Sequence, residues 1–284
     1  MTAMDDAVRV RGLRKVYAGR TVVDGIDLDI RAGECFALLG PNGAGKTTTI
    51  EILEGFRRRD GGDVAVLGAD PAAGDRQWRA RVGVVAQGLG AVLELSVREM
   101  LQHFAAYHGA PRETGELLTA VGLTDAAGTR VRNLSGGQRR RLDVALGVQG
   151  RPELLFLDEP TTGLDPAARR QFWTLLESLR AEGTTILLTT HYLDEAAHLA
   201  DRVAVIAAGR LLETAPPDQL GAALRLTAVV RWTEDGAVHE VPTATPFATV
   251  RELCTRFPTG ELPDFAVVRP SLEDVYLAML EDAS

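Results

Sequence analysis

The chain has 284 residues, of which 45 % are apolar and 25 % charged, so it can form one large and one small domain and is not expected to be disordered. Its 31 basic and 39 acidic residues leave a formal net charge of −8, which argues against broad affinity for nucleic acid, because proteins that bind the phosphate backbone normally carry a basic face. The only two cysteines, Cys35 and Cys254, are too few for a disulfide framework or a zinc site, so both are expected to be small buried apolar side chains.

The first predicted elements form an antiparallel edge sheet. Apolar and polar residues alternate over Val8–Arg11 and Asp24–Ile30, as in half-buried strands. Cys35–Leu39 is continuously apolar, which predicts a strand buried on both faces. It leads directly into the glycine-rich loop Gly40–Thr47 and a helix over Lys46–Glu54, the order of strand, loop and helix that a phosphate-binding motif requires.

The middle of the chain predicts a helical insertion. A further sheet strand over Val82–Val85 ends at Gln87, and the composition then changes to helix-forming stretches at Val97–Tyr107 and Arg112–Val121. We therefore interpret residues 89–133 as a helical insertion into the larger domain.

Alternating α and β order returns after this insertion. The pattern predicts, in chain order, helix Gln138–Leu146, strand Leu154–Leu157, helix Ala167–Arg180, strand Thr185–Thr189, helix Leu193–Ala200 and strand Val203–Ile206. Such alternation favours a parallel sheet with right-handed crossovers. Three consecutive arginines, Arg139–Arg141, lie in the first of these helices and are expected to form a solvated face.

The C-terminal region predicts a small α+β domain. The pair Pro216-Pro217 marks a boundary, so we expect one domain at residues 1–220 and a second at 221–284. Beyond the boundary the residues favour strand-like segments Leu224–Trp232, Val238–Val241 and Phe265–Val268, a helix near Phe247–Phe257 and a last helix at Leu272–Leu280.

The loop at residues 40–47 has the pattern G-x-x-x-x-G-K-[ST], which cradles nucleotide phosphates. Its glycines let successive backbone N–H groups point at phosphate oxygens, and the following helix N-terminus adds partial positive charge. Lys46 can reach the β- and γ-phosphates, and the Thr47 hydroxyl can bind Mg²⁺. The residues expected to bind the nucleotide here are Asn42, Gly43, Ala44, Gly45, Lys46, Thr47 and Thr48.

Two carboxylates and a histidine follow strands that should end beside this loop. Asp158 ends an apolar strand and is expected to meet the metal ion, directly or through a water. Glu159 comes next and is expected to accept a proton from the attacking water. His191 follows the strand Thr185–Thr189 and would lie near the γ-phosphate.

These motifs, in this order, resemble the nucleotide-binding subunit of an ATP-binding cassette (ABC) transporter over about residues 8–220. The run Leu134-Ser135-Gly136-Gly137-Gln138 matches the family signature, Gly163-Leu164-Asp165 matches the loop that crosses the dimer interface, and His191 matches the switch histidine. The resemblance implies an α/β fold of the P-loop NTPase ABC-cassette type: a mainly parallel core sheet with helices, an antiparallel edge sheet and a helical insertion, plus the small C-terminal α+β domain.

The resemblance also implies roles for residues outside the phosphate loop. Tyr17 is similar to the aromatic residue that stacks on adenine, and Gln87 is similar to the glutamine that contacts Mg²⁺ and senses the membrane partner. In the family, two subunits close head to tail, so the signature of one covers the ATP held by the other. The residues implied to contact this second ATP are Ser135, Gly137, Gln138 and Asp165.

The expected partners follow from the resemblance and from hydropathy. No apolar stretch approaches the roughly 20 residues that span a bilayer, so the transmembrane part would be a separate permease subunit. The cassette itself would pair with a second copy or with a paralogous cassette, and it would be cytoplasmic and peripheral on the inner face of the cell membrane. ATP and Mg²⁺ are the expected cofactors, and no nucleic acid is expected.

The C-terminal segment Pro270–Tyr276 resembles the tail of drug and antibiotic exporter ATPases of the daunorubicin-resistance type. The resemblance favours an ATPase that powers export of a drug, an antibiotic or another hydrophobic small molecule. Two alternatives stay open: a soluble cassette ATPase that acts on ribosomes or nucleic acid, and an importer ATPase. A simple nucleotide kinase is disfavoured, because it would have no use for the signature or for His191.

Overall fold

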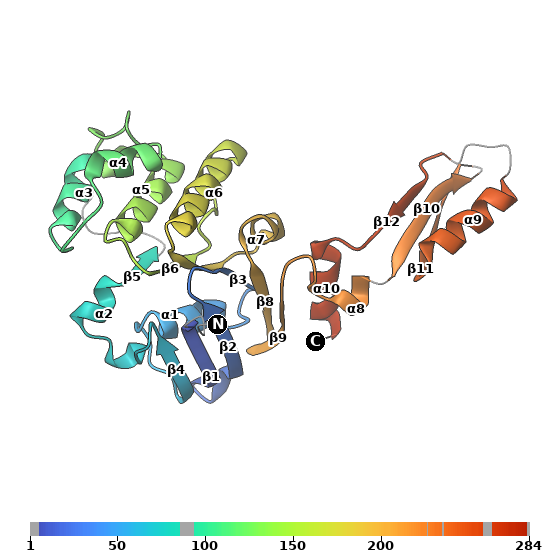
Figure 1. Ribbon diagram of the computed structural model, residues 1–284, viewed down its shortest axis with the longest axis horizontal. Helices are drawn as coiled ribbons and strands as arrows, with labels where there is room; N and C mark the ends of the chain where they lie inside the picture. Colours follow the sequence, from blue (N-terminus) through green and yellow to red (C-terminus); the bar gives the residue numbers. More distant parts are fainter. Residues whose placement is uncertain (1–5, 86–93, 226, 235, 258–262, 283–284) are drawn as a thin grey trace, which may run out of the picture. The chain divides into compact units, whose positions relative to one another are not determined.

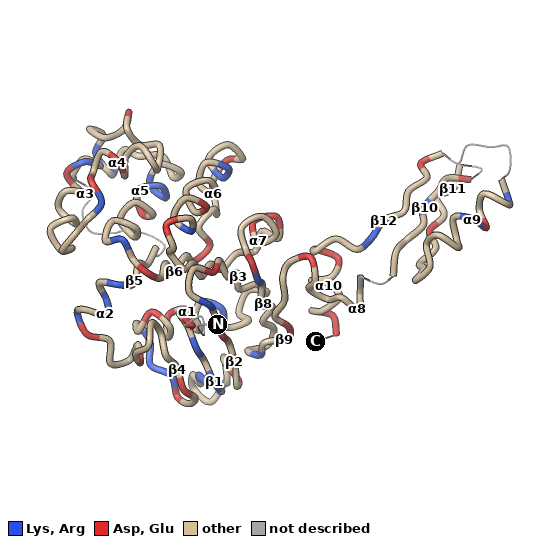
Figure 2. Tube along the Cα trace, in the orientation of Figure 1, with Lys and Arg blue, Asp and Glu red and all other residues tan. Residues whose placement is uncertain are grey.

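The computed structural model describes residues 6–85, 94–225, 227–234, 236–257 and 263–282 (Figure 1). By their contacts the residues form two compact units, Met1–Thr214 and Ala215–Ser284. The sequence-based prediction that one domain ends at residue 220 and the next begins at residue 221 stays a prediction. Basic and acidic residues are interspersed along the trace of both units (Figure 2).

The first sheet of the larger unit is antiparallel, with strand order β2-β1-β4. β1 (Asp6–Tyr17) and β2 (Arg20–Arg31) extend well beyond the alternating segments from which they were predicted. β4 (Gly61–Val66) was not predicted, because its two leading glycines and short apolar part carry little strand signal. It pairs with β1 on the side away from β2.

The second sheet has the order β5-β6-β7-β3-β8-β9, and its pairs from β5 to β8 are parallel. Its strands are β3 (Cys35–Leu39), β5 (Val82–Val85), β6 (Leu154–Asp158), β7 (Thr185–Thr189), β8 (Arg202–Ala207) and β9 (Arg210–Ala215). The predicted parallel core is therefore confirmed. Only β9 was not predicted; it returns beside β8 after the two-residue turn Ala208-Gly209.

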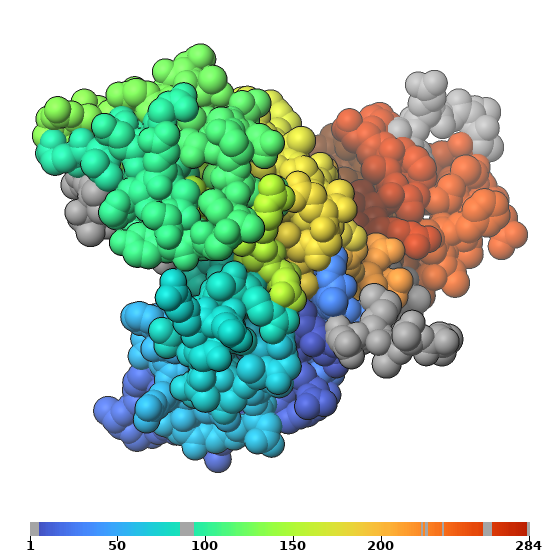
Figure 3. Space-filling model, turned by 60° about the vertical axis from the view of Figure 1, so that its left-hand side comes forward, coloured from blue at the N-terminus to red at the C-terminus, as the bar shows by residue number. Residues whose placement is uncertain are grey.

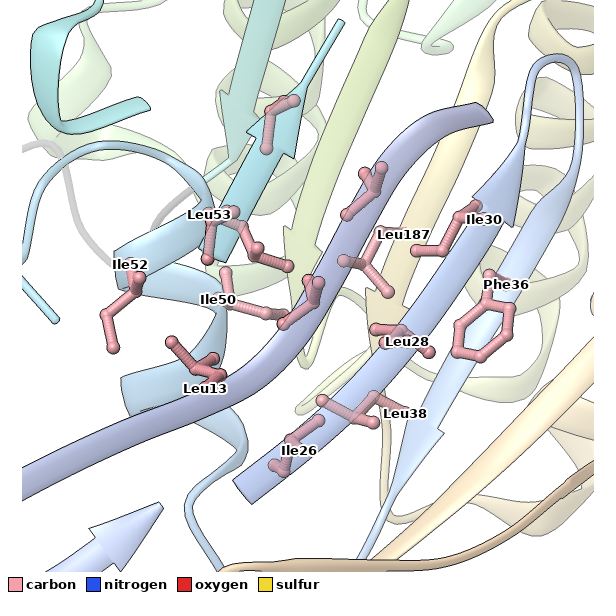
Figure 4. Close-up of a cluster of buried hydrophobic side chains, with 14 of the residues drawn as sticks. Leu13, Ile26, Leu28, Ile30, Phe36, Leu38, Ile50, Ile52, Leu53 and Leu187 are labelled. Carbon is pink, nitrogen blue, oxygen red and sulfur yellow. The ribbon is translucent and has the colours of Figure 1, made fainter. Parts of the chain in front are cut away.

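The core of the larger unit lies where the two sheets meet (Figure 4). Side chains of β1 and β2 point toward β3 and toward the helix α1 (Lys46–Leu53), and Phe36 and Leu38 lie among them without solvent exposure. Burial of an apolar side chain of this size contributes about 1.5–3 kcal/mol. This packing fixes β3 and α1, and hence the loop between them.

Helices surround the parallel sheet. They are α2 (Arg76–Ala80), α3 (Val97–Ala105), α4 (Thr114–Ala120), α5 (Gly136–Val148), α6 (Pro166–Ala181) and α7 (Leu193–Leu199), with short 3₁₀ turns at Pro71–Ala73 and Val131–Asn133. The described part of the predicted insertion, from residue 94 to 133, contains α3 and α4, and α3 packs against α5 in the lobe coloured green in Figure 3. A capping box between Ser96 and Glu99 starts α3.

The smaller unit contains an antiparallel sheet of order β11-β10-β12, with β10 (Ala228–Glu234), β11 (Ala237–Thr243) and β12 (Ala266–Val268). Its helices are α8 (Ala222–Arg225), α9 (Pro246–Arg256) and α10 (Leu272–Asp282). Val230 and Trp232 of β10 pack against Leu253 of α9 in a separate small core. The unit is therefore α+β, as expected.

Two sequence-based expectations for this unit are wrong. The segment predicted to be strand-like from residue 224 begins inside the short helix α8, and the strand starts only at Ala228. Cys254 is exposed, because Leu253 takes the position on α9 that faces the sheet and Cys254 follows it on the next face of the helix. Cys35 is buried, as expected. No helix in the described ranges is long and apolar enough to cross a membrane.

Candidate functional site

The carboxyl ends of three neighbouring parallel strands meet at one edge of the sheet. Asp158 at the end of β6 lies beside Thr189 at the end of β7, and Thr189 lies beside Leu38 of β3. The loop Gly40–Thr47 leaves β3 at this edge, and His191 follows β7. The topology therefore brings together the loop, the carboxylates and the histidine that the sequence marked as separate motifs. Ligands of open α/β sheets bind at such an edge.

The phosphate loop follows a path that requires glycine at two positions. A Cβ on Gly40 would lie 2.3 Å from the carbonyl oxygen of Ile206, so no side chain fits there. Gly45 has φ of +105° and would bring a Cβ within 2.7 Å of the Val22 carbonyl oxygen. Gly45 is also the N-cap of α1, and no side chain caps the first turn of this helix. Its leading N–H groups are thus left for an anion.

Lys46 is a buried cation at this edge. Its Nζ donates to the carbonyl oxygens of Gly40 at 2.7 Å and Pro41 at 3.1 Å, so the side chain folds back along the loop. Burial lowers the pKa of Lys46, while the nearby carboxylates of Glu159 and Asp158 act in the opposite direction. The Lys46 ammonium and the uncapped N–H groups at the start of α1 are suited to bind a polyphosphate chain.

Asp158 is held in place by the neighbouring strand. The Thr189 hydroxyl donates to its Oδ1 at 2.5 Å, and among the described residues Oδ2 accepts no hydrogen bond. The backbone N–H of Glu159 points back toward Thr189, with the hydroxyl at 3.0 Å and the carbonyl oxygen at 3.1 Å. Sequence reasoning did not single out Thr189; the available signal was a hydroxyl at the end of an apolar strand expected to lie beside Asp158.

Glu159 and His191 face one another across the ends of β6 and β7. His191 Nδ1 lies 3.6 Å from Glu159 Oε1, and the Thr162 hydroxyl lies 3.4 Å from the other carboxylate oxygen. The Glu159 side chain is 23 % exposed and that of His191 is 45 % exposed, so both can meet a bound molecule. Glu159 has φ of +47°, an uncommon conformation for a residue with a side chain.

One arginine of the signature helix is buried, contrary to the expectation of a solvated face. Arg140 donates from Nε to the Pro160 carbonyl oxygen at 3.0 Å and from a terminal nitrogen to the Asp158 carbonyl oxygen at 2.7 Å. Its position on α5 turns it inward, toward the end of β6. A run of three arginines does not by itself indicate which of them faces the protein interior. Arg140 thus ties α5 to the segment that carries both carboxylates.

The signature residues start α5. Ser135 and Gln138 form a capping box, in which the Gln138 N–H donates to the Ser135 hydroxyl at 3.2 Å and the Gln138 side chain accepts from the Ser135 N–H at 3.0 Å. A Cβ on Gly137 would lie 3.5 Å from Leu164. Asp165 caps α6 through the N–H groups of Ala167 and Ala168. That these residues contact a second ATP stays a prediction.

The sequence also predicted roles for Tyr17 and Gln87. Tyr17 ends β1, and the cations of Lys15 and Arg57 lie 5.2 and 5.4 Å from the centre of its ring. Two cations thus lie near this ring, and its role in stacking on adenine stays a prediction. Gln87 lies outside the described residues.

The edge suits ATP and Mg²⁺. Because Gly40 and Gly45 have no side chains, a triphosphate can approach the backbone N–H groups of the loop closely. The Thr47 hydroxyl and the Asp158 carboxylate supply hard oxygen atoms, and Mg²⁺ takes few protein ligands because phosphates and water complete its shell. Within the described ranges, no group of three or more His, Cys, Asp or Glu residues could hold a metal ion by protein ligands alone.

Comparison with known proteins gives the same assignment. Residues 23–162 match the family described as "ABC transporter". The chain is 44 % identical to the daunorubicin/doxorubicin resistance ATP-binding protein of Streptomyces peucetius, over 77 % of this chain and 68 % of that protein. It is 39 % identical to a daunorubicin resistance ATP-binding protein of Streptomyces coeruleorubidus, over 98 % of this chain and 97 % of that protein.

A third relative and two solved structures extend the comparison. The chain is 46 % identical to the Nod factor export ATP-binding protein I of Ralstonia nicotianae, over 74 % of this chain and 67 % of that protein. The ATP-binding subunit of an ABC transporter matches with a TM-score of 0.70 and 26 % identity, over 76 % of this chain and 92 % of the other. A dimeric ATP-binding cassette with ADP and phosphate has the same fold, with a TM-score of 0.67 and 22 % identity, over 74 % and 98 %.

Proposed function

The chain belongs to the ABC transporter family, and we propose that it is the ATP-hydrolysing subunit of an exporter whose transmembrane part is a separate permease. The observation that carries the proposal is the near full-length similarity to a daunorubicin resistance ATP-binding protein, which includes the C-terminal unit. A relative named for Nod factor export favours the same direction of transport. We infer a drug, an antibiotic or another hydrophobic small molecule as the cargo.

The chain is an ATPase, and its residues divide the reaction as follows. Lys46 and the N–H groups of the loop bind the β- and γ-phosphates. Glu159 accepts a proton from the water that attacks the γ-phosphorus, and the bond to the bridging oxygen breaks to give ADP and phosphate. His191, 3.6 Å from Glu159, orients this carboxylate and the γ-phosphate. Thr189 holds Asp158 and the backbone of Glu159, so both carboxylates keep their positions.

Mg²⁺ is the expected cofactor of this reaction. Thr47 and Asp158 would hold it, together with Gln87, and it would neutralise charge on the phosphates. Thr189 donates to Asp158 Oδ1, and no residue that the structure describes donates to Oδ2. Removal of divalent cations with EDTA is expected to abolish hydrolysis and to weaken ATP binding less.

We further infer that two cassettes, either two copies of this chain or this chain and a paralogue, enclose ATP between the phosphate loop of one and the signature of the other. ATP would then bias the pair toward a closed state, and hydrolysis would reopen it. The chain would be cytoplasmic and peripheral, bound to its permease on the inner face of the membrane.

The decisive experiment isolates the tagged Glu159→Gln chain with ATP from membranes of its native cell and identifies the bound proteins by mass spectrometry. A multi-span membrane protein in stoichiometric amount supports the exporter, and its reconstitution with the wild-type chain should give ATP-dependent efflux of a fluorescent drug from vesicles. Ribosomal proteins or nucleic acid in its place would favour a soluble cassette, and uptake would favour an importer.

A further inference from the structure

The residue that follows His191 is an uncommon choice for its position in the helix. Tyr192 is the N-cap of α7, where Ser, Thr, Asp and Asn are favoured because their side chains accept a hydrogen bond from the first turn. The side chain of Tyr192 makes no such bond. The phenol ring therefore calls for a role other than starting the helix.

The Tyr192 ring lies against the imidazole of His191. The centres of the two rings are 4.1 Å apart, and their planes are inclined by 39°. Rings at this separation are in van der Waals contact, so the phenol limits the rotamers that the imidazole can adopt. The Nδ1 atom of the same imidazole lies 3.6 Å from Glu159 Oε1. The ring contact thus restricts the directions in which His191 can face this carboxylate.

Backbone hydrogen bonds fix the chain on both sides of this contact. The Tyr192 N–H donates to the Thr190 hydroxyl at 2.9 Å, a bond that spans His191. The Tyr192 carbonyl oxygen accepts from the N–H groups of Glu195 at 3.1 Å and Ala196 at 3.3 Å, in the first turn of α7. These bonds set the backbone but not the side-chain torsions, so orientation of the imidazole depends on what its ring touches.

A cation on the neighbouring helix α6 lies over the phenol ring. The guanidinium carbon of Arg169 is 4.2 Å from the centre of the Tyr192 ring, which is a favourable cation–π distance. The Arg169 side chain is half-buried, and its Nε is enclosed with no hydrogen-bond partner among the residues that the structure describes. Hydrogen bonding of this nitrogen therefore does not explain the position of the guanidinium, whereas attraction to the ring does.

These contacts connect His191 with the start of α6. Arg169 lies one turn after Asp165, the N-cap of this helix, and its N–H donates to the Asp165 carbonyl oxygen at 2.9 Å. The guanidinium then contacts Tyr192, whose ring contacts the imidazole. Each step in this series is a direct contact between neighbouring side chains or backbone groups.

We propose that Tyr192 is a positioning residue for ATP hydrolysis, which keeps the imidazole of His191 directed at Glu159. Arg169 in turn holds the Tyr192 ring in place. The inference rests on the proposed roles of His191 and Glu159. Tyr192 and Arg169 contact neither nucleotide nor metal in this role; they act through the imidazole. Loss of either contact should therefore lower turnover and leave ATP affinity unchanged.

The test measures kcat for ATP hydrolysis and the Kd of a fluorescent ATP analogue, using the full chain. Tyr192→Leu keeps an apolar side chain but removes the ring. It is expected to lower kcat by about 10- to 100-fold, because small displacements of catalytic groups have effects of this size, with a change in Kd below about 3-fold. Tyr192→Phe keeps the ring and should stay within about 3-fold of wild type in both quantities, because both contacts are made by the ring and not by the hydroxyl.

Arg169→Met tests the second contact and keeps the test decisive if Tyr192→Leu does not fold. It keeps an unbranched side chain but removes the cation, so kcat should fall by about 3- to 10-fold at unchanged Kd. Arg170→Met is the matched control, because Arg170 is the next residue of α6 and is exposed. It should leave both quantities as in wild type.

The double variant separates positioning from packing. In the Tyr192→Leu background, Arg169→Met should cause no further loss of kcat, because Arg169 acts through the ring that is already missing. Two independent structural defects would instead multiply their losses, and that result would overturn the series of contacts from α6 to the imidazole.

The outcomes also separate this inference from the function on which it rests. Wild-type kcat in both Tyr192→Leu and Arg169→Met would overturn the positioning role, and so would parallel losses of kcat and ATP affinity, which indicate packing alone. Hydrolysis by His191→Ala near the wild-type rate would overturn the role of His191 itself. An inactive His191→Ala together with a fully active Tyr192→Leu would leave the proposed function intact and reject only the inference about Tyr192.

Discussion

At the residue scale, Glu159 has a backbone conformation that its surroundings must stabilise. Its φ of +47° belongs to a region that non-glycine residues adopt at a cost of about 1–3 kcal/mol, and such residues persist only when their surroundings determine them. Here the determinant is Thr189, which receives the Glu159 N–H. The consequence is a carboxylate turned toward His191 and not along the direction of β6.

The substitution Glu159→Gln tests the base role of this carboxylate. The amide keeps the shape and the backbone contacts but cannot accept a proton at neutral pH, so kcat should fall by about 10²- to 10⁴-fold. The Kd for ATP should stay close to wild type, because Lys46 and the loop bind the phosphates. Steady-state hydrolysis and equilibrium binding of a fluorescent ATP analogue check the two parts, and hydrolysis near the wild-type rate would remove Glu159 from the role of base.

A second residue near the site makes stability depend on pH. Glu54 lies at the end of α1, and its burial, with smaller contributions from Asp158 and Glu51, raises its pKa from 4.5 to about 7. The folded state thus disfavours the ionised form. This penalty is absent below pH 4.5, where the carboxyl is protonated in folded and unfolded chains, grows as the pH rises, and is complete above pH 7.

The variant Glu54→Gln should remove this penalty. At pH 8 we expect its free energy of unfolding to exceed that of wild type by about 1–3 kcal/mol, since one unit of pKa corresponds to about 1.4 kcal/mol and part of the shift is relieved by relaxation. At pH 4.5 the two proteins should be nearly equal, which serves as the internal control. Urea unfolding at both pH values measures the difference; an equal gain at both would mean that ionisation of Glu54 is not its cause.

At the scale of elements, the link between α5 and β6 is a buried arginine and not an apolar contact alone. Arg140 satisfies the carbonyl oxygens of Asp158 and Pro160, and Asp143 lies one turn further along the same helix. Movement of the signature at the start of α5 is thereby coupled to the position of the carboxylates at the end of β6.

The substitution Arg140→Met should break this link while keeping an unbranched side chain of similar length. We expect the free energy of unfolding to fall by about 2–4 kcal/mol, because the carbonyl oxygens of Pro160 and Asp158, one buried and one partly buried, lose this donor and Asp143 loses a nearby positive charge. Urea unfolding checks this value, and kcat should fall as well. Arg170→Met, at an exposed position on α6, is the control and should change stability by less than about 0.5 kcal/mol.

The elements that sequence patterns could predict are those whose burial is complete or strictly periodic. Continuous apolar runs identified β3 and β6, and the glycine pattern between β3 and α1 located the phosphate loop. The strands β4 and β9 escaped prediction, because β4 begins with two glycines and β9 has no fully buried side chain, so both carry little periodic signal. The inward position of Arg140 depends on tertiary packing, which local patterns do not encode.

At the scale of the whole molecule, the hydrogen bonds that the signature residues 134–138 make within their own chain do not explain why these residue types are present. Ser135 and Gln138 already cap α5, and many other residue pairs can form a capping box. Two adjacent glycines after Ser135 weaken the first turn of a helix, and they are needed only if a ligand approaches the backbone closely. The proposed ligand is the ATP held by a second cassette.

Mixed dimers test this arrangement. Lys46→Ala removes the phosphate cation, whereas Ser135→Asp keeps a good N-cap and places a negative charge where the γ-phosphate of the partner's ATP would lie. Each variant alone should be inactive, since both sites of its homodimer are damaged. In an equimolar mixture, half of the dimers combine one chain of each kind and contain one intact site, so activity should recover to about one quarter of wild type.

The recovery depends on which chain supplies each half of the site. If the phosphate loop and signature of one chain formed a site together, every chain in the mixture would carry one defect and no activity would return. The control places both substitutions in one chain and mixes it with wild type: its heterodimers should then contain no intact site, and activity should come only from wild-type pairs. Hydrolysis measured over a range of chain concentrations completes the test, because a site shared between chains must lose specific activity on dilution below the dissociation constant of the pair.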